Sequence, residues 1–167
     1  PNKKTGMSWK IAVGFKLGFL GGSKMTGNIT TDAKDQGVVV FVGNSTFVGD
    51  LGSNGTNLHD VAINAGVNAN ISGNIYTTHF GNAGTLTLGK DMAISSDIDA
   101  ASGSTLNLAG HNLTANGVIL GAAGNMNVNF GSSSAATLIL TNAVIDNAVL
   151  HKDSIIRTHF DSMPYIA

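Results

Sequence analysis

A repeat of about 20 residues in the middle of the chain constrains the fold more than any other feature of the sequence. Two apolar positions, separated by one residue, recur three times at this interval. One series is Leu86, Leu106 and Met126, and the other is Leu88, Leu108 and Val128. Each pair follows a short turn of Gly, Ala, Ser and Asn residues. A fixed period of this length is the sequence signature of a solenoid, in which each repeat is one structural unit.

Within each repeat the apolar residues alternate with polar ones, which is the period of a β-strand with one buried face. A strand of four residues buries too little apolar surface alone, so successive repeats must stack. Stacking places the repeats in parallel register about 4.8 Å apart. The sequence therefore predicts an all-β fold, a parallel β-helix (solenoid) of about five turns between Val38 and Leu150, with rungs of roughly 20 residues. The two series above are predicted to form two buried core columns.

The first series extends toward the N-terminus with less regular spacing, through Val61–Ile63 and Val40–Val42. We interpret the longer interval between Val61 and Leu86 as an inserted loop on one turn. A second apolar strand recurs inside each period, at residues 47–51, 70–75, 93–98 and 113–118. An antiparallel sandwich or barrel also has short strands and glycine turns. Neither of these folds requires residue types to recur at a fixed interval.

The composition agrees with a chain of strands and turns. There are 22 glycines and no glutamate, and every acidic residue is aspartate. The absence of cysteine excludes a disulfide scaffold, a zinc ribbon and a thiol nucleophile. Asparagines recur at the turns, where stacked side chains can hydrogen-bond to one another along a column. These asparagines are Asn44, Asn54, Asn64, Asn74, Asn82, Asn112, Asn116 and Asn125.

The charge is unevenly distributed and suggests three segments. Residues 1–34 contain six lysines and one aspartate, and we expect them to form a basic irregular N-terminal segment or cap. Residues 35–150, which are acidic, are the predicted β-helix, and residues 151–167 form a tail that does not continue the repeat. An acidic body without a basic stripe argues against nucleic-acid binding. The apolar run at 11–20 is too short to span a membrane; a short membrane-surface helix is an alternative to the cap.

Candidate catalytic and metal-binding groups are few, and we predict no catalytic site, no cofactor and no metal. The five histidines lack the spacing of a metal site and are expected to be isolated: His59, His79, His111, His151 and His159. Asp97 and Asp99 are two residues apart and share one face of a strand. Paired carboxylates can carry out glycoside chemistry, although no basic residue lies near them in sequence. Ser132–Ser134 lacks the second glycine of a nucleophile elbow.

Three segments carry a resemblance to a known family: Gly84–Gly89, Gly103–Gly110 and Val38–Leu51. They resemble the passenger domains of rickettsial surface cell antigens, most nearly the outer-membrane protein A and B type autotransporters. The resemblance covers roughly residues 35–150 and implies a β-helix displayed on the bacterial cell surface. It also implies a part in a surface layer and in adhesion to host cells. The signal peptide and the translocator barrel of such a protein are expected outside this chain.

The leading hypothesis is therefore a non-catalytic surface protein that is structural and adhesive. Its expected partners are a host-cell surface protein or neighbours in a surface layer. One alternative is a β-helical carbohydrate-active enzyme, for which 1 Trp and 2 Tyr are few sugar-stacking residues. Another is a remnant of a split autotransporter gene without function. We also expect the C-terminal edge, at residues 137–145, to be the weaker end of the solenoid and to self-associate edge to edge.

Overall fold

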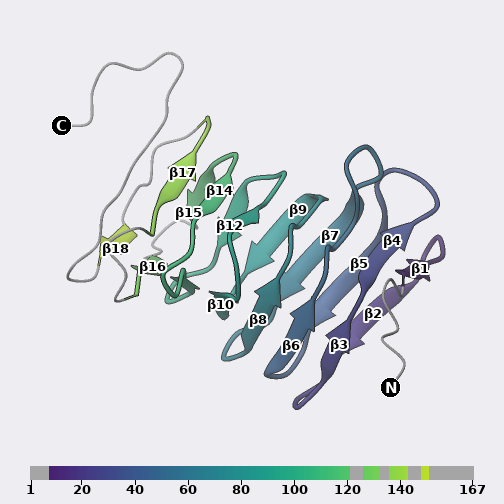
Figure 1. Ribbon diagram of the computed structural model, residues 1–167, viewed down its shortest axis with the longest axis horizontal. Helices are drawn as coiled ribbons and strands as arrows, with labels where there is room; N and C mark the ends of the chain where they lie inside the picture. Colours follow the sequence, from purple (N-terminus) through teal and green to yellow (C-terminus); the bar gives the residue numbers. More distant parts are fainter. Residues whose placement is uncertain (1–7, 121–125, 132–135, 143–147, 151–167) are drawn as a thin grey trace, which may run out of the picture.

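The computed structural model describes residues 8–120, 126–131, 136–142 and 148–150, and these residues form strands and turns without a helix. Every pairing between strands is parallel, as the repeat predicts (Figure 1). The strands of the first half are β1 (Ser8–Ile11), β2 (Lys16–Phe19), β3 (Lys24–Thr26), β4 (Asn28–Thr31), β5 (Gln36–Phe41), β6 (Ser45–Val48), β7 (Leu58–Ile63), β8 (Asn68–Ser72) and β9 (Thr77–Asn82). Those of the second half are β10 (Thr85–Leu88), β11 (Met92–Ala93), β12 (Ile98–Ala100), β13 (Thr105–Asn107), β14 (Leu113–Ala115), β15 (Val118–Leu120), β16 (Met126–Asn129), β17 (Leu138–Leu140) and β18 (Ala148–Leu150).

The strands stack on three faces of one solenoid. The first face has the order β15-β12-β9-β7-β5-β2, and the second has the order β18-β16-β13-β10-β8-β6-β3. The third face consists of β1-β4 at one end and β11-β14-β17 at the other. Single-residue bridges join these two parts through Ile29, Leu51, Ile75 and Ile94. The chain thus makes about six turns, with a spacing of about 21 residues.

The core is a continuous stack of inward-facing apolar side chains from all three faces. Leu86 and Leu106 pair directly and are fully buried, as are Ile29 and Leu51 on the third face. Burial of one such side chain contributes about 1.5–3 kcal/mol. Because each turn alone has only three short strands, this stabilisation depends on the turns above and below it.

The third member of each predicted column requires a correction. All six predicted core residues are buried, but Leu106 pairs with Val128, two residues after the predicted Met126. Met126 instead pairs with Ala148 of the next turn. The turn that leads from β13 to β16 is therefore two residues longer than the repeat in the sequence. Because the two additional residues are an even number, the side chains still alternate with the same face inward.

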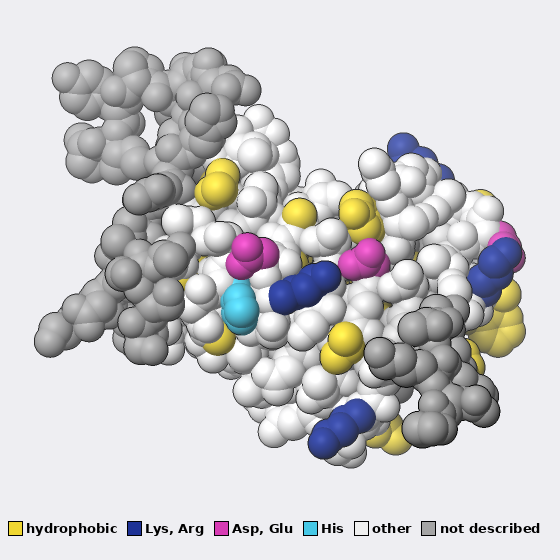
Figure 2. Space-filling view, in the orientation of Figure 1, with side chains coloured by type: hydrophobic (Ala, Val, Ile, Leu, Met, Phe, Trp, Pro, Cys, Tyr) yellow, Lys and Arg dark blue, Asp and Glu magenta, His cyan; other side chains and the backbone are white. Residues whose placement is uncertain are grey.

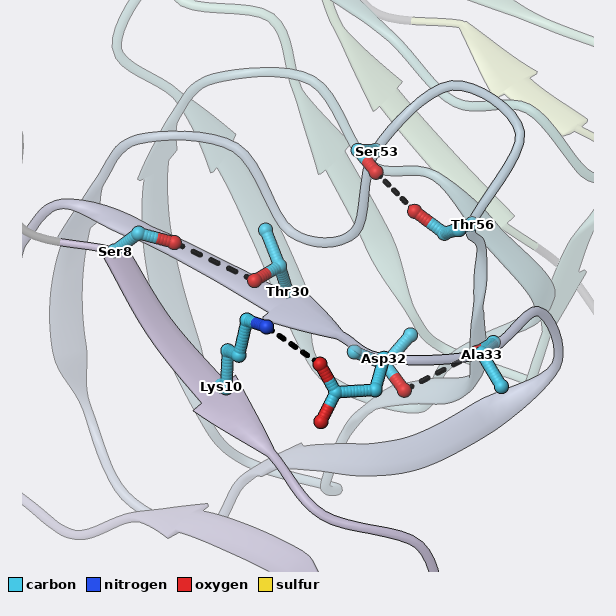
Figure 3. A network of polar contacts seen from close by, with 8 residues as sticks. Ser8, Lys10, Thr30, Asp32, Ala33, Ser53 and Thr56 are labelled. Carbon is cyan, nitrogen blue, oxygen red and sulfur yellow. Dashed lines mark hydrogen bonds and ion pairs between the residues drawn. The ribbon is translucent and has the colours of Figure 1, made fainter.

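The prediction of an irregular N-terminal segment is wrong for residues 8–31. β2 pairs with β5, and β3 pairs with β6, so this basic segment forms the first turn of the solenoid. Figure 3 shows how β1 lies beside β4. The Lys10 ammonium donates to the Asp32 carboxylate at 2.6 Å, and the hydroxyls of Ser8 and Thr30 are 3.4 Å apart. The predicted tail at 151–167 lies outside the described residues.

The predicted extension of the first series toward the N-terminus was wrong, because it joined residues that lie on two different faces of the solenoid. Val61 and Val39 pair on the first face, whereas Leu86 pairs with Ala69 on the second. The longer interval between Val61 and Leu86 is therefore a change of face and not an inserted loop. Three strands with the same alternation follow one another in each turn, so the pattern of one strand does not reveal its face.

Asparagine side chains connect successive turns at the corners, as predicted, but mostly through bonds to backbone N–H groups, and aspartate, which was not predicted there, takes part. The Asn28 side-chain oxygen accepts from the Asp50 backbone N–H at 2.9 Å. Asp50 Oδ1 accepts from the Asn74 N–H at 2.7 Å, and Asn74 Oδ1 accepts from the Ala93 N–H at 2.9 Å. The ladder therefore satisfies backbone groups at a bend, where strand pairing is interrupted. Direct bonding between stacked amides occurs at Asn142 and Asn116.

Truncation of this ladder should reduce stability. We expect Asn74→Ala to lower the free energy of unfolding by about 1–2 kcal/mol, because the Ala93 N–H loses its acceptor. Asn64→Ala is the matched control: Asn64 is exposed and its side chain has no hydrogen bond to a described residue, so its loss should be below about 0.5 kcal/mol. Urea unfolding of the two variants tests this. Equal losses would show that the ladder adds nothing.

Candidate functional site

The first face carries a shallow groove with a volume of about 550 Å³, where histidines and aspartates from three turns meet. Strands β7, β9 and β12, with Asp97 directly before β12, contribute the polar side chains, and the exposed Ile119 of β15 also lines the groove. The polar lining residues are His59, Asp60, Thr78, His79, Asp97 and Asp99.

An irregularity in strand alternation produces this group of side chains. Leu58 and Val61 both point into the core, so the two residues between them, His59 and Asp60, both face outward. β9 repeats the arrangement between Thr77 and Phe80. The buried Thr77 hydroxyl lies 2.8 Å from the His79 carbonyl and 3.3 Å from the Leu58 carbonyl, and it holds both strands in this conformation.

A histidine–aspartate contact joins two turns beside the groove. His59 Nδ1 lies 3.0 Å from Asp35 Oδ1, and the His59 and His79 rings are edge to face with centroids 5.7 Å apart. Asp35 has a φ of 61°, a left-handed conformation that aspartate tolerates better than most residues. The hydrogen bond from His59, followed by one from Thr78, lowers the pKa of the Asp35 carboxyl below its usual value of 3.8.

This lowered pKa predicts a measurable pH dependence. A carboxyl whose pKa is lower in the folded than in the unfolded chain stabilises the fold at pH values above its pKa in the unfolded chain. That contribution is lost as the pH falls through the folded value. We expect an NMR titration to place the Asp35 midpoint below 3.8 and His59→Ala to raise it. His79→Ala removes only the weakest of the effects on the Asp35 pKa, so it should raise the Asp35 midpoint less than His59→Ala does. A larger rise for His79→Ala would contradict the assignment of His59 as the main cause.

Asp97, directly before β12, and Asp99 within it both face the groove, as the sequence predicts for residues two apart, with the fully buried Ile98 between them. Asp97 Oδ1 accepts a hydrogen bond of 2.6 Å from the Asn116 amide of the next turn. Asp97 therefore already serves in a contact between turns.

The remaining predicted positions do not join this group. His111 lies 3.7 Å from Asp91 on another face of the solenoid. His151, His159 and Ser132–Ser134 lie outside the described residues. Within the described ranges, no group of three or more His, Asp or Glu side chains is arranged to hold a metal ion.

The groove itself was missed in the sequence, although a signal was present. His59, His79 and Asp99 follow one another at the same interval as Leu86 and Leu106, which is the period of the repeat. Residues at this spacing lie on neighbouring turns, so the histidines are adjacent and not isolated.

The described part of the chain contains no helix, and hence none long and apolar enough to cross a membrane. Comparisons of the chain with protein-family models, with curated proteins and with solved structures found no match.

Proposed function

We propose that this chain is a non-catalytic structural and adhesive protein of the bacterial cell surface, part of an autotransporter-type passenger. One observation carries the proposal: most aspartates of the described residues join neighbouring turns of the solenoid. Five of these carboxylates bind a group 19 to 24 residues away, on a neighbouring turn: Asp32, Asp35, Asp50, Asp91 and Asp97. The polar groups thus stiffen the column.

The mechanism is geometric. About six turns at about 4.8 Å each give a column roughly 29 Å long. Outward side chains of successive turns form fixed rows along the three faces, and a binding partner meets these rows as a regular surface. The resemblance to surface cell antigens of the rickettsial type supports a host-cell surface protein or a surface-layer neighbour as that partner.

The groove is the observation that favours a second candidate, a β-helical carbohydrate-active enzyme. Such enzymes require a carboxylic acid whose pKa is raised, so that it can protonate the leaving group. Asp35, beside this groove, has a lowered pKa, and Asp97 is held by Asn116. The adhesive function is therefore the better supported.

Both candidates are tested with the purified chain. Beads coated with the purified chain should adhere to cultured mammalian cells, and addition of the soluble chain should reduce the number of bound beads. Beads coated with the chain after heat unfolding are the control, since adhesion through fixed rows requires the fold. Absence of adhesion by the folded chain would contradict the proposal.

The same preparation should release no reducing ends from a panel of bacterial and host polysaccharides. Asp97→Asn and Asp99→Asn are the diagnostic variants. Release that either substitution abolishes would establish the enzyme instead.

A further inference from the structure

Two Asn-Gly dipeptides occur in the chain, and the structure places them in opposite environments. They are Asn54–Gly55 and Asn116–Gly117. In this dipeptide the backbone nitrogen of the glycine can attack the side-chain amide of the asparagine, because glycine has no side chain to obstruct the approach. The reaction requires that the asparagine is accessible and that its amide group is free to move.

Asn54 and Gly55 form the exposed tip of a short turn that leads from the third face to the first. The Ser53 N–H donates to the Thr56 carbonyl at 3.2 Å, and the Thr56 N–H donates to the Ser53 carbonyl at 3.1 Å. Figure 3 shows the Ser53 and Thr56 hydroxyls facing one another at the base of this turn. The turn is therefore closed at its base, while its tip meets the solvent.

No contact holds the reacting groups of this tip apart. Neither the Asn54 side chain nor the Gly55 N–H has a hydrogen bond to a described residue. Gly55 has a φ of 90°, and a Cβ atom at this position would meet nothing within 4 Å. The Gly55 nitrogen and its target, the side-chain carbonyl carbon of Asn54, thus lie in open surroundings.

The second dipeptide is fixed between turns of the solenoid. Asn116 Nδ2 donates to Asp97 Oδ1 at 2.6 Å, and Asn116 Oδ1 accepts a hydrogen bond from the Asn142 amide. Gly117 is buried, and its carbonyl accepts from the Ile98 N–H at 2.9 Å. Ring closure at Asn116 would therefore require the loss of contacts on both sides of its turn.

We propose that Asn54 is a site of spontaneous deamidation in the folded chain. The Gly55 nitrogen attacks Asn54 Cγ, so an N–Cγ bond forms and the Cγ–Nδ2 bond breaks. The proton of the Gly55 nitrogen leaves with Nδ2 as ammonia, and a succinimide ring remains. Water then opens the ring at Cγ, which gives aspartate, or at the backbone carbonyl carbon, which gives isoaspartate. The inference goes beyond the proposed function and does not depend on it.

The reaction changes the surface charge and leaves the core in place. Figure 2 shows a surface that is mostly uncharged, and charged residues make up only 11 % of the chain. A carboxylate at Asn54 makes the formal net charge of −1 one unit more negative. Leu51 and Leu58, on either side of the turn, are fully buried and paired with neighbouring turns. The protein should therefore accumulate an acidic but folded form with age.

The rates at the two dipeptides test the proposal. The purified chain is incubated at physiological pH and temperature, digested with trypsin and analysed by mass spectrometry. Trypsin cleaves after Lys34 and Lys90, so Asn54 and Asn116 fall in different peptides. We expect deamidation at Asn54 to be at least about tenfold faster, because each hydrogen bond that must break at Asn116 slows ring closure severalfold. Equal rates, or no deamidation at Asn54, would overturn the proposal.

Two changes of conditions test the mechanism. The rate at Asn54 should rise with pH, because the attacking nitrogen must lose its proton; a rate independent of pH would contradict the ring closure. In urea, Asn116 loses its contacts between turns, so its rate should approach that of Asn54. If Asn116 remained at least about tenfold slower in urea, the fold would not be the source of its protection.

Two substitutions on the same loop provide a variant and its matched control. Asn54→Gln should abolish the deamidated form of the peptide 35–90, because ring closure on glutamine requires a larger ring. Asn57→Gln is the control, since the half-buried Asn57 is followed by Leu58, whose side chain obstructs the attack. Its rate of deamidation should equal that of the unsubstituted chain. Ion-exchange chromatography follows the acidic form in each case, and an acidic form that persists in Asn54→Gln would overturn the proposal.

Discussion

Substitution of Leu106 by aspartate should prevent cooperative folding, whereas Asn107→Asp should leave the chain folded. Leu106 is fully buried between Leu86 and Val128 on the second face. Loss of leucine packing costs about 2–5 kcal/mol, and burial of an unpaired carboxylate adds to it. Since domains are stable by only about 5–15 kcal/mol, the sum approaches the whole stability of the fold.

Asn107 is the matched position, because it is adjacent and faces outward, with Nδ2 3.4 Å from the Thr87 hydroxyl. Its replacement by aspartate should cost less than about 1 kcal/mol. Circular dichroism during heating measures both variants. Equal losses of thermal stability would show that the two side chains do not face opposite ways.

Gly73→Ala should produce the second largest loss, about 3 kcal/mol. A Cβ atom at Gly73 would overlap the carbonyl oxygen of Gly49, which lies directly beside it on the neighbouring turn. The carbonyl oxygen belongs to the backbone and the Cβ atom is bonded directly to it, so the clash is relieved only if two turns move apart. Separation of these turns would weaken the ladder from Asp50 to Asn74 as well.

Gly81→Ala provides the control for the alanine substitution itself. A Cβ atom at Gly81 would meet no other atom within 4 Å. The free energy of unfolding of the Gly81→Ala variant should therefore change by less than about 0.5 kcal/mol. Urea unfolding separates the two variants. A loss at Gly73 no larger than that at Gly81 would contradict the close approach of these turns.

The sequence predicts the stacking because the period of the repeat is directly visible at Leu86 and Leu106. It does not predict the register at Val128, because turn length varies while strand alternation does not. An insertion of two residues keeps every apolar side chain inward and leaves no trace in the pattern. Register therefore depends on the length of each turn.

The N-terminal turn was missed because its lysines suggested a separate basic segment. In Lys16–Phe19 the lysine faces outward, while Leu17 and Phe19 point to the core. The paired strand one turn later shows the same alternation at Val39 and Phe41. The structure stacks the Phe19 and Phe41 rings at 4.8 Å, so a comparison of alternation at variable spacing would have found this turn.

The groove could be predicted only in part. Asp97 and Asp99 share a side, as strict alternation requires. His59 and Asp60 share a side for the opposite reason, because the strand is irregular there. Leu58 pairs there with Thr77 of the next turn, and no local sequence pattern encodes such a contact between turns.

The central claim, a single parallel column, is tested most directly by distances between spin labels. The chain has no cysteine, so pairs of introduced cysteines can be labelled uniquely. Outward positions on the second face pair in succession from Lys24 through Thr46, Asn70, Thr87 and Asn107 to Asn129. With one label at Lys24, each later position should add about 4.8 Å, which gives about 24 Å at Asn129. A distance that fails to increase along this series, as an antiparallel sandwich requires, would contradict the solenoid.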